Sequence, residues 1–116
     1  MLQPENSLEL LKTVTTENLF EKLVTQLNKD FQLANIDKLF KSTISINKLA
    51  EELSGILLHL IQFKYDDYLN LLYRIDISEK ELATIKSSNL KDSIEQVSFI
   101  ILKREFQKVW LKRNYK

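Results

Sequence analysis

The chain has 116 residues, enough for one hydrophobic core but not for two, so we expect a single domain over residues 1–116. Hydrophobic residues make up 44% and charged residues 28% of the sequence, which argues against wholesale disorder. The net charge is only +1, and the lack of cysteine excludes disulfides, thiolate metal sites and cysteine nucleophiles. The sequence contains only one glycine and one proline. This scarcity argues against β architectures and phosphate-cradling loops, because such structures need glycine at positions with positive φ.

We therefore predict an all-α protein, an irregular bundle of four to five helices with a long C-terminal helix. Residues 1–14 carry a leucine-rich cluster that we expect to form a short helix docked loosely on the rest of the chain. A first long helix is predicted to follow a cap at Thr15 or Thr16, because apolar residues recur at helical spacing over residues 19–34. Residues 35–43 are then expected to form a looser connection, which Ile36, Leu39 and Phe40 can still anchor through apolar contacts.

The second helix is predicted to begin near Ser45 or Asn47 and to end near Phe63, with one broad apolar face. Residues 45–55 are also similar to the first helix and turn of a helix-turn-helix unit. The following residues, 56–61, are almost all apolar, whereas a recognition helix must present polar side chains to base edges. We therefore favour one continuous helix over a DNA-reading motif.

A third helix is predicted over residues 66–74, and a short fourth helix after Ser78, which forms a capping box with Glu81. Residues 87–89 are then expected to break the chain and to cap the long last helix. β-Branched residues alternate over 43–46 and 74–77, which leaves short strands there as a less favoured alternative.

The apolar stripe of the last helix changes sides halfway along. One face carries Leu90, Ile94, Val97 and Ile101, and nearly the opposite face carries five further apolar residues. Because the two halves of the helix are apolar on nearly opposite faces, we predict that two different structural units pack against it. We therefore interpret the second face as an interface with another copy of the chain, formed by Phe99, Leu102, Phe106, Val109 and Trp110.

Positive charge is concentrated at the C-terminus, where residues 103–116 carry six Lys or Arg against one acid. The basic stripe that we single out consists of Arg104, Lys108, Lys112, Arg113 and Lys116. Cations near a helix C-terminus are stabilised by the macrodipole, so a solvated tail without a ligand is one interpretation. The alternative interpretations give the stripe a partner: an acidic protein surface, nucleic acid or anionic lipid. If the partner is nucleic acid, Trp110 and Tyr115 are available to stack on its bases.

Catalytic groups are scarce in this sequence. His59 is the only imidazole, it lies off the apolar face of its helix, and Glu52 is two turns away. Asp66 and Asp67 are adjacent, so on a helix they diverge by about 100° and more simply face the macrodipole. Di-iron, calcium-loop, Walker and serine-elbow motifs are absent. We expect no enzyme, cofactor or metal, and retain only a pocket enzyme using Tyr65, Tyr68, Asp66 or Asp76 as a third possibility.

Two stretches together resemble a known group of sequences. They are Tyr68-Leu-Asn-Leu-Leu-Tyr-Arg-Ile-Asp-Ile-Ser-Glu-Lys80 and Ile100-Ile-Leu-Lys-Arg-Glu-Phe-Gln-Lys-Val-Trp110. The group consists of short, uncharacterised helical bacterial proteins with no assigned activity, and the resemblance covers about two-thirds of the chain. It implies a bacterial cytosolic origin and no mechanism. Tyr73 and Arg74 could pack on the last helix, with Arg74 paired to Glu105 or Asp76 paired to Arg104.

The N-terminus lacks the basic and apolar regions of a signal peptide, and no apolar run is long enough to span a membrane. We therefore expect a cytoplasmic protein. The leading functional hypothesis is a small non-enzymatic protein-interaction module that self-associates through its C-terminal helix. The alternative is a nucleic-acid-binding protein that uses the basic stripe.

Overall fold

The computed structural model describes residues 4–86 and 89–114, and this part of the chain contains six helices and no strand. The helices are α1 (Ser7–Thr16), α2 (Phe20–Leu33), α3 (Ile46–Phe63), α4 (Tyr65–Ile75), α5 (Glu79–Ala83) and α6 (Leu90–Asn114). The predictions of an all-α fold and of a long C-terminal helix are confirmed. The described part of the chain has one helix more than the four to five predicted for the bundle, and the short helix expected near the N-terminus is present as α1.

The N-terminal segment is the first correction. Asn6 rather than a threonine caps the opening helix, with its side chain accepting a hydrogen bond from the Glu9 backbone at 3.0 Å. Thr15 and Thr16, predicted as caps for the next helix, belong to α1, and α2 begins at Phe20 without a side-chain cap. The expected loose docking is also wrong, because α1 buries an apolar face in the common core, formed by Leu10, Leu11 and Val14.

The later helix starts follow the sequence signals. Ser45 caps α3 by accepting from the Lys48 backbone at 3.1 Å, and Ser78 caps α5 by accepting from the Glu81 backbone at 3.1 Å. Asn89 accepts from the Asp92 backbone at 2.9 Å at the start of α6. Residues 43–46 and 74–77 form no strand. Residues 87 and 88 of the predicted break lie outside the described residues.

The α3 helix runs without interruption through Gly55, as the continuous-helix interpretation predicts. A Cβ atom added at Gly55 would meet nothing within 4 Å, so close approach of another segment does not require the glycine. A separate second helix of a helix-turn-helix unit is therefore absent at this position. The apolar residues among 56–61 belong to α3 and pack on the core instead.

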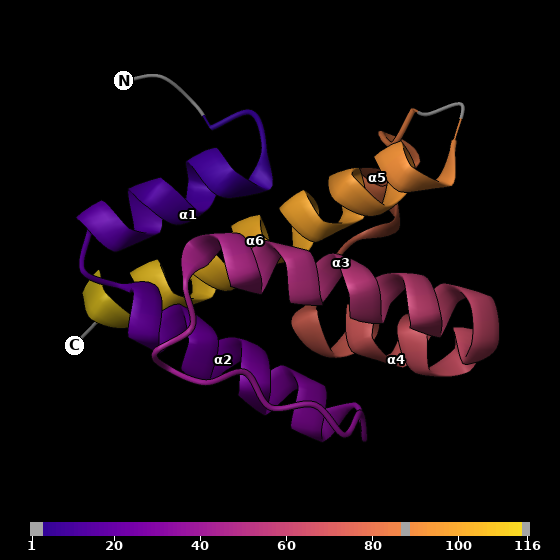
Figure 1. Ribbon diagram of the computed structural model, residues 1–116, viewed down its shortest axis with the longest axis horizontal. Helices are drawn as coiled ribbons and strands as arrows, with labels where there is room; N and C mark the ends of the chain where they lie inside the picture. The colour runs from indigo at the N-terminus through magenta and orange to yellow at the C-terminus, as the bar shows by residue number, and fades with distance from the viewer. Residues whose placement is uncertain (1–3, 87–88, 115–116) are drawn as a thin grey trace.

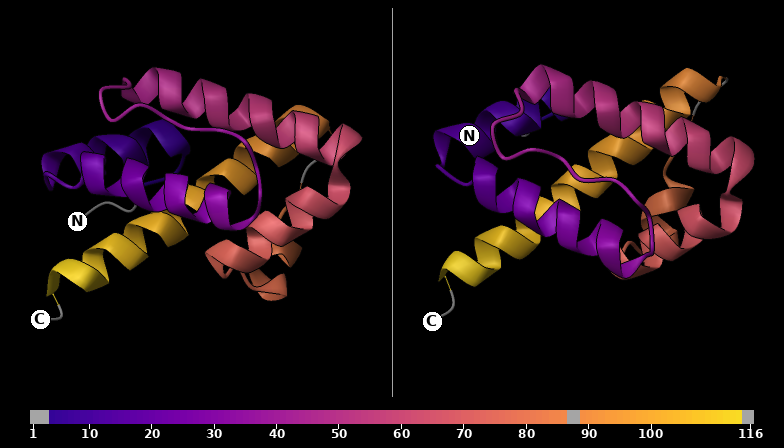
Figure 2. Two further views of the ribbon diagram at one scale, coloured as in Figure 1. Left: turned by 90° about the horizontal axis from the view of Figure 1, so that it is seen from below. Right: turned by 60° about the horizontal axis from the view of Figure 1, so that its bottom comes forward.

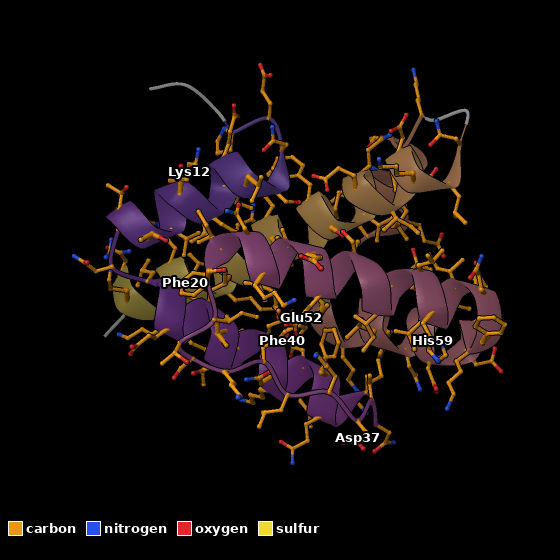
Figure 3. The ribbon with its side chains drawn as sticks, in the orientation of Figure 1. Lys12, Phe20, Asp37, Phe40, Glu52 and His59 are labelled. Atoms are coloured by element: carbon orange, nitrogen blue, oxygen red, sulfur yellow. The ribbon has the colours of Figure 1, made fainter. Side chains whose placement is uncertain are left out.

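The connection between α2 and α3 is anchored rather than loose. Phe40 turns inward between these helices (Figure 3) and its ring meets that of Phe31 edge to face, with 5.4 Å between the centroids. The Asn28 side chain bonds both the backbone N–H of Phe40 at 2.8 Å and its carbonyl at 2.9 Å. Lys38 and Glu52 add an ion pair of 2.7 Å. The prediction that apolar residues would anchor this segment is confirmed for Ile36 and Phe40, which are buried, and is wrong for Leu39, which is 76% exposed.

The C-terminal helix is the central element of the bundle. It packs against α1, α2, α3 and α4 (Figure 1), and in Figure 2 it runs diagonally across the bundle from the α3 side to the side of α1 and α2. Within residues 4–86 and 89–114, no helix has the length and apolarity needed to cross a membrane. The four helices around α6 decide which of its side chains remain available for a partner.

Candidate functional site

The side-switching stripe of α6 is covered by the chain itself. Ile94, Val97 and Ile101 are buried as the first face, but Leu102 and Val109 of the second face are buried too, at 0% and 4% exposure. The prediction that these two contact a second copy is therefore wrong. The cover for both faces is intramolecular, because α1, α2, α3 and α4 all pack against α6.

The other three predicted interface residues are less enclosed. Phe99 and Phe106 are half-buried and pack against the core, while Trp110 remains 41% exposed. Arg113 lies over the Trp110 ring with 4.9 Å to its centroid, and Phe106 lies 6.5 Å from that ring. A hollow of about 240 Å³ opens here between α1 and α6. Trp110 is thus the only one of the five that offers a largely free surface.

The basic stripe is neutralised from within the chain over most of its length. Arg104 pairs with Asp76 at 3.1 Å, and Arg113 binds both the carbonyl and the carboxylate of Glu17 at 2.8 and 3.2 Å. Lys108 lies 2.7 Å from Asp30. Lys116 lies outside the described residues. A continuous positive track along α6, which the nucleic-acid alternative needs, is therefore interrupted by carboxylates of the bundle.

One of the two pairings considered between the motif stretches is present. Asp76 pairs with Arg104, whereas Arg74 is exposed and Glu105 lies beside Lys108 and Asp30 instead. Tyr73 is also exposed and does not pack on the last helix. The clamp between α4 and α6 is therefore made by Asp76, whose left-handed backbone (φ 73°) ends α4.

A buried charge cluster joins α2 to α6. Lys108 lies 2.7 Å from Asp30 and 3.1 Å from Glu105, and both carboxylates are shielded from solvent. Burial, followed by the neighbouring Asp30 carboxylate, raises the pKa of Glu105 to about 8, although the nearby Lys108 acts in the opposite direction. Glu105 is therefore protonated at neutral pH, which removes its charge from the buried cluster. The cluster is enclosed between α2 and α6, where it joins the two helices.

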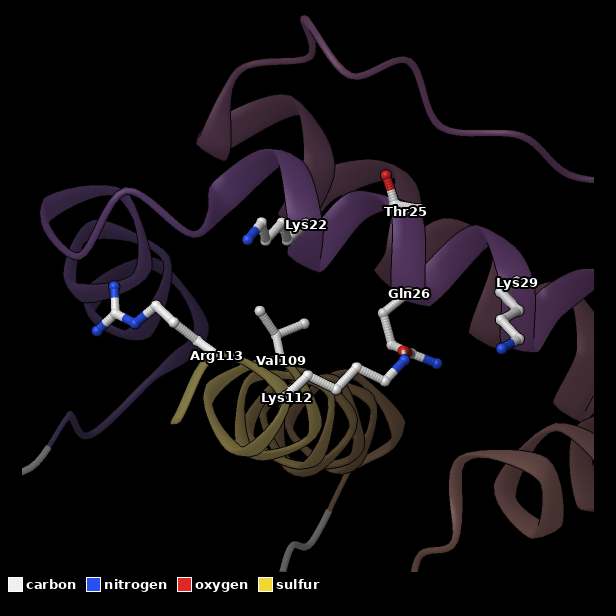
Figure 4. A pocket seen from close by; sticks show the side chains of 7 residues that line it. All are labelled: Lys22, Thr25, Gln26, Lys29, Val109, Lys112 and Arg113. Atoms are coloured by element: carbon white, nitrogen blue, oxygen red, sulfur yellow. Dashed lines mark hydrogen bonds between the residues drawn. The ribbon is translucent and has the colours of Figure 1, made fainter. Parts of the chain in front are cut away.

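A groove of about 440 Å³ opens beside this cluster, between α2 and α6 (Figure 4). Its lining consists of Lys22, Thr25, Gln26 and Lys29 from α2 and Val109, Lys112 and Arg113 from α6. Lys112 extends to Gln26 and donates to its side-chain oxygen at 2.7 Å. Lys112 and Arg113 were candidates in the sequence, but Lys22 and Lys29 were not, because sequence alone does not show which face of α2 meets α6.

The outer side of α4 carries the second surface that sequence reasoning missed. Tyr65, Leu69 and Tyr73 are 54%, 46% and 78% exposed and recur at i, i+4 and i+8, so they line up along the helix. We call these three residues the α4 stripe. Phe63, at the end of α3, is also exposed. The spacing was visible in the sequence, but the buried Tyr68, Leu71, Leu72 and Ile75 made the apolar content of the helix look like core.

The candidate catalytic residues do not form a site. His59 is exposed on α3 (Figure 3), where its ring lies 5.4 Å from that of Phe63. Tyr68 is buried, and desolvation raises its pKa above the usual value, whereas Tyr65 and Asp66 face solvent. Within the described ranges, no group of three His, Cys, Asp or Glu side chains could hold a metal ion.

Comparison of the chain with protein-family models, curated proteins and solved structures finds no match. Functional inference therefore depends on the surfaces of the molecule alone.

Proposed function

We propose that this protein is a small non-enzymatic interaction module that self-associates through the α4 stripe. One observation carries the proposal: three large side chains, Tyr65, Leu69 and Tyr73, stay exposed in line on a helix whose other face is buried. Single exposed apolar residues are common on soluble proteins, but an aligned row of two aromatics and a leucine is typical of an interaction surface. The proposal places self-association on α4 rather than on the predicted C-terminal helix.

The residues next to the stripe favour a second copy of the chain as the occupant. Asp66, Asn70 and Arg74 each follow a stripe residue by one position and so form a parallel row on α4. If two α4 helices pack antiparallel about Leu69, Asp66 of one copy meets Arg74 of the other at both ends. Neither residue makes an ion pair within the described part of the chain. The antiparallel arrangement also opposes the two helix dipoles.

The size of the surface sets the expected affinity. An 11-residue helix is only about 16 Å long. A contact between two such helices buries less surface than the roughly 1,200–2,000 Å² of a standard protein interface. The net charge of +1 leaves little repulsion between copies. We therefore expect a reversible dimer with a dissociation constant of about 10–100 μM, because small interfaces give weak association.

Sedimentation equilibrium over a wide concentration range tests the proposal. The wild-type chain should pass from monomer to dimer, whereas Leu69→Glu should remain monomeric, because it places two carboxylates at the centre of the interface. Leu111→Glu is the matched control, since Leu111 is 44% exposed but lies on α6. A wild-type chain that stays monomeric at high micromolar concentration, or a dimer lost only with Leu111→Glu, would contradict the proposal.

Charge exchange tests the antiparallel geometry. Asp66→Arg alone should weaken the dimer by about tenfold, because two arginines then face each other at each end. The double variant Asp66→Arg/Arg74→Asp should restore most of the affinity, since the pairs are re-formed with reversed sign. If the double variant is as weak as the single one, the two helices do not pair in this orientation.

A further inference from the structure

We infer that the groove between α2 and α6 is a binding site for a small organic phosphate. Four cations, Lys22, Lys29, Lys112 and Arg113, line one cavity of about 440 Å³, and no carboxylate is among its lining residues. The two lysines of α2 stand seven positions apart and therefore on the same side of that helix. Gathering positive charges in a groove whose lining holds no acid is unfavourable unless an anion enters, so the groove favours a ligand of negative charge.

The partners of these four cations show which charges are available. Lys22 and Lys29 are exposed and make no ion pair within residues 4–86 and 89–114. Lys112 donates only to the neutral amide oxygen of Gln26. Arg113 is paired with Glu17, which lies outside the lining of the groove. Three of the four cations therefore keep their charge free for a ligand.

The shape of the surroundings selects a compact ligand over a nucleic-acid chain. Seven residues of helix span about 10 Å, which matches two or three linked phosphates rather than a strand of several nucleotides. Beyond the groove, the positive charges of Arg104 and Lys108 are already paired with Asp76 and Asp30, so the positive surface does not continue. Val109 and the aliphatic stems of the lysines supply an apolar wall for the organic part of the ligand.

The groove also communicates with the buried cluster through one side chain. Gln26 accepts from Lys112 at 2.7 Å and donates to Asp30 at 3.3 Å, and Asp30 in turn accepts from Lys108 at 2.7 Å. This chain of hydrogen bonds fixes the amide of Gln26 and holds Lys112 along the groove. The cation is thus positioned before a ligand arrives, which lowers the entropic cost of binding.

Calorimetric titration with inorganic pyrophosphate in magnesium-free, low-salt buffer tests the inference. Wild-type protein should bind one pyrophosphate, and the double variant Lys22→Gln/Lys29→Gln should bind at least about tenfold more weakly, because two charge-assisted contacts are lost. The control is Lys12→Gln/Lys103→Gln, which removes two exposed lysines outside the groove. The control should lose clearly less affinity than the groove variant, since its two lysines lie outside the groove and act on the ligand only through the longer-range field.

Three outcomes would overturn the inference. Wild-type protein that binds no pyrophosphate at low millimolar concentration excludes a phosphate site in the groove. Equal weakening by both double variants means that binding reflects net charge rather than the groove. A single-stranded oligonucleotide that binds more tightly than pyrophosphate and loses affinity with both variants would identify a nucleic-acid surface instead. All the altered lysines are exposed, so circular dichroism should show unchanged folding in every variant.

Discussion

The two halves of α6 are held in the bundle by different interactions. The N-terminal half packs through Ile94, Val97 and Ile101 and makes no ion pair within the described residues. Its polar contacts are hydrogen bonds, which include Ser98 with Ser54 of α3 at 3.3 Å and Glu95 with the backbone N–H of Ser7 at 3.2 Å. The C-terminal half also buries Leu102 and Val109, but charged groups fix its position against α1, α2 and α4. One helix therefore combines a dry apolar contact with a network of buried and exposed ion pairs.

This difference has a physical consequence for stability. Apolar burial is insensitive to pH and only indirectly sensitive to salt, whereas buried charges depend on the protonation of each partner. We expect the attachment of the C-terminal half, but not that of the N-terminal half, to respond to pH. Three substitutions, taken from the largest expected effect to the smallest, can break or sharpen this contrast.

Lys108→Met should destabilise the protein by about 3–5 kcal/mol, because it leaves the buried Asp30 carboxylate without its cation. Ile101→Ala is the matched change in the N-terminal half and should cost about 2–5 kcal/mol through a cavity. Urea unfolding at several pH values separates the two, since only the Lys108 variant should change the pH profile. A cost below about 1 kcal/mol for Lys108→Met would show that the cluster does not anchor α6.

Glu105→Gln should stabilise the protein at neutral and alkaline pH. The pKa of Glu105 is 4.5 in the reference state and about 8 in the fold, so the folded state holds a proton that the unfolded state releases over this range. Wild-type stability should therefore be fully present below pH 4.5, fall as pH rises and level off above about 8. Glutamine cannot ionise.

The gain from Glu105→Gln should be on the order of 2 kcal/mol at pH 8 and should shrink toward zero near pH 4.5. Thermal unfolding at pH 5, 6.5 and 8 measures this gain. Gln96→Glu cannot serve as the reverse control on the same helix, because Gln96 is only half-buried. A parallel offset between wild type and Glu105→Gln at all three pH values would contradict a raised pKa for this carboxyl.

Arg104→Ala should have the smallest effect, about 0.5 kcal/mol, because the Asp76 carboxylate that it pairs with is largely exposed to solvent. Adding 0.5 M salt, a rough threshold at which exposed pairs are screened, should abolish the difference from wild type. Unfolding by denaturant at low and high salt checks both expectations. A loss as large as that of Lys108→Met would mean that the exposed clamp, rather than the buried cluster, fixes the C-terminal half.

The sequence by itself determined the secondary structure from α3 onward. Ser45 and Ser78 predicted two helix starts correctly. Each side-chain oxygen accepts from a backbone N–H three residues later, so this capping depends only on local sequence. The absence of breakers and the 3.6-residue periodicity likewise gave the all-α class and the long last helix. The N-terminus was misread, because Thr15 and Thr16 are also good caps but Asn6 begins a helix earlier.

Only the tertiary structure decided which apolar and charged faces remain free. The stripes of α4 and α6 look alike in the sequence, yet Leu102 and Val109 are buried while Leu69 and Tyr73 stay exposed. Likewise, Lys108 is paired across 78 residues of sequence with Asp30, whereas Lys22 and Lys29 keep their charges beside α6. Periodicity records only that a face is apolar or basic. What covers that face depends on contacts between residues far apart in the chain, which no local pattern encodes.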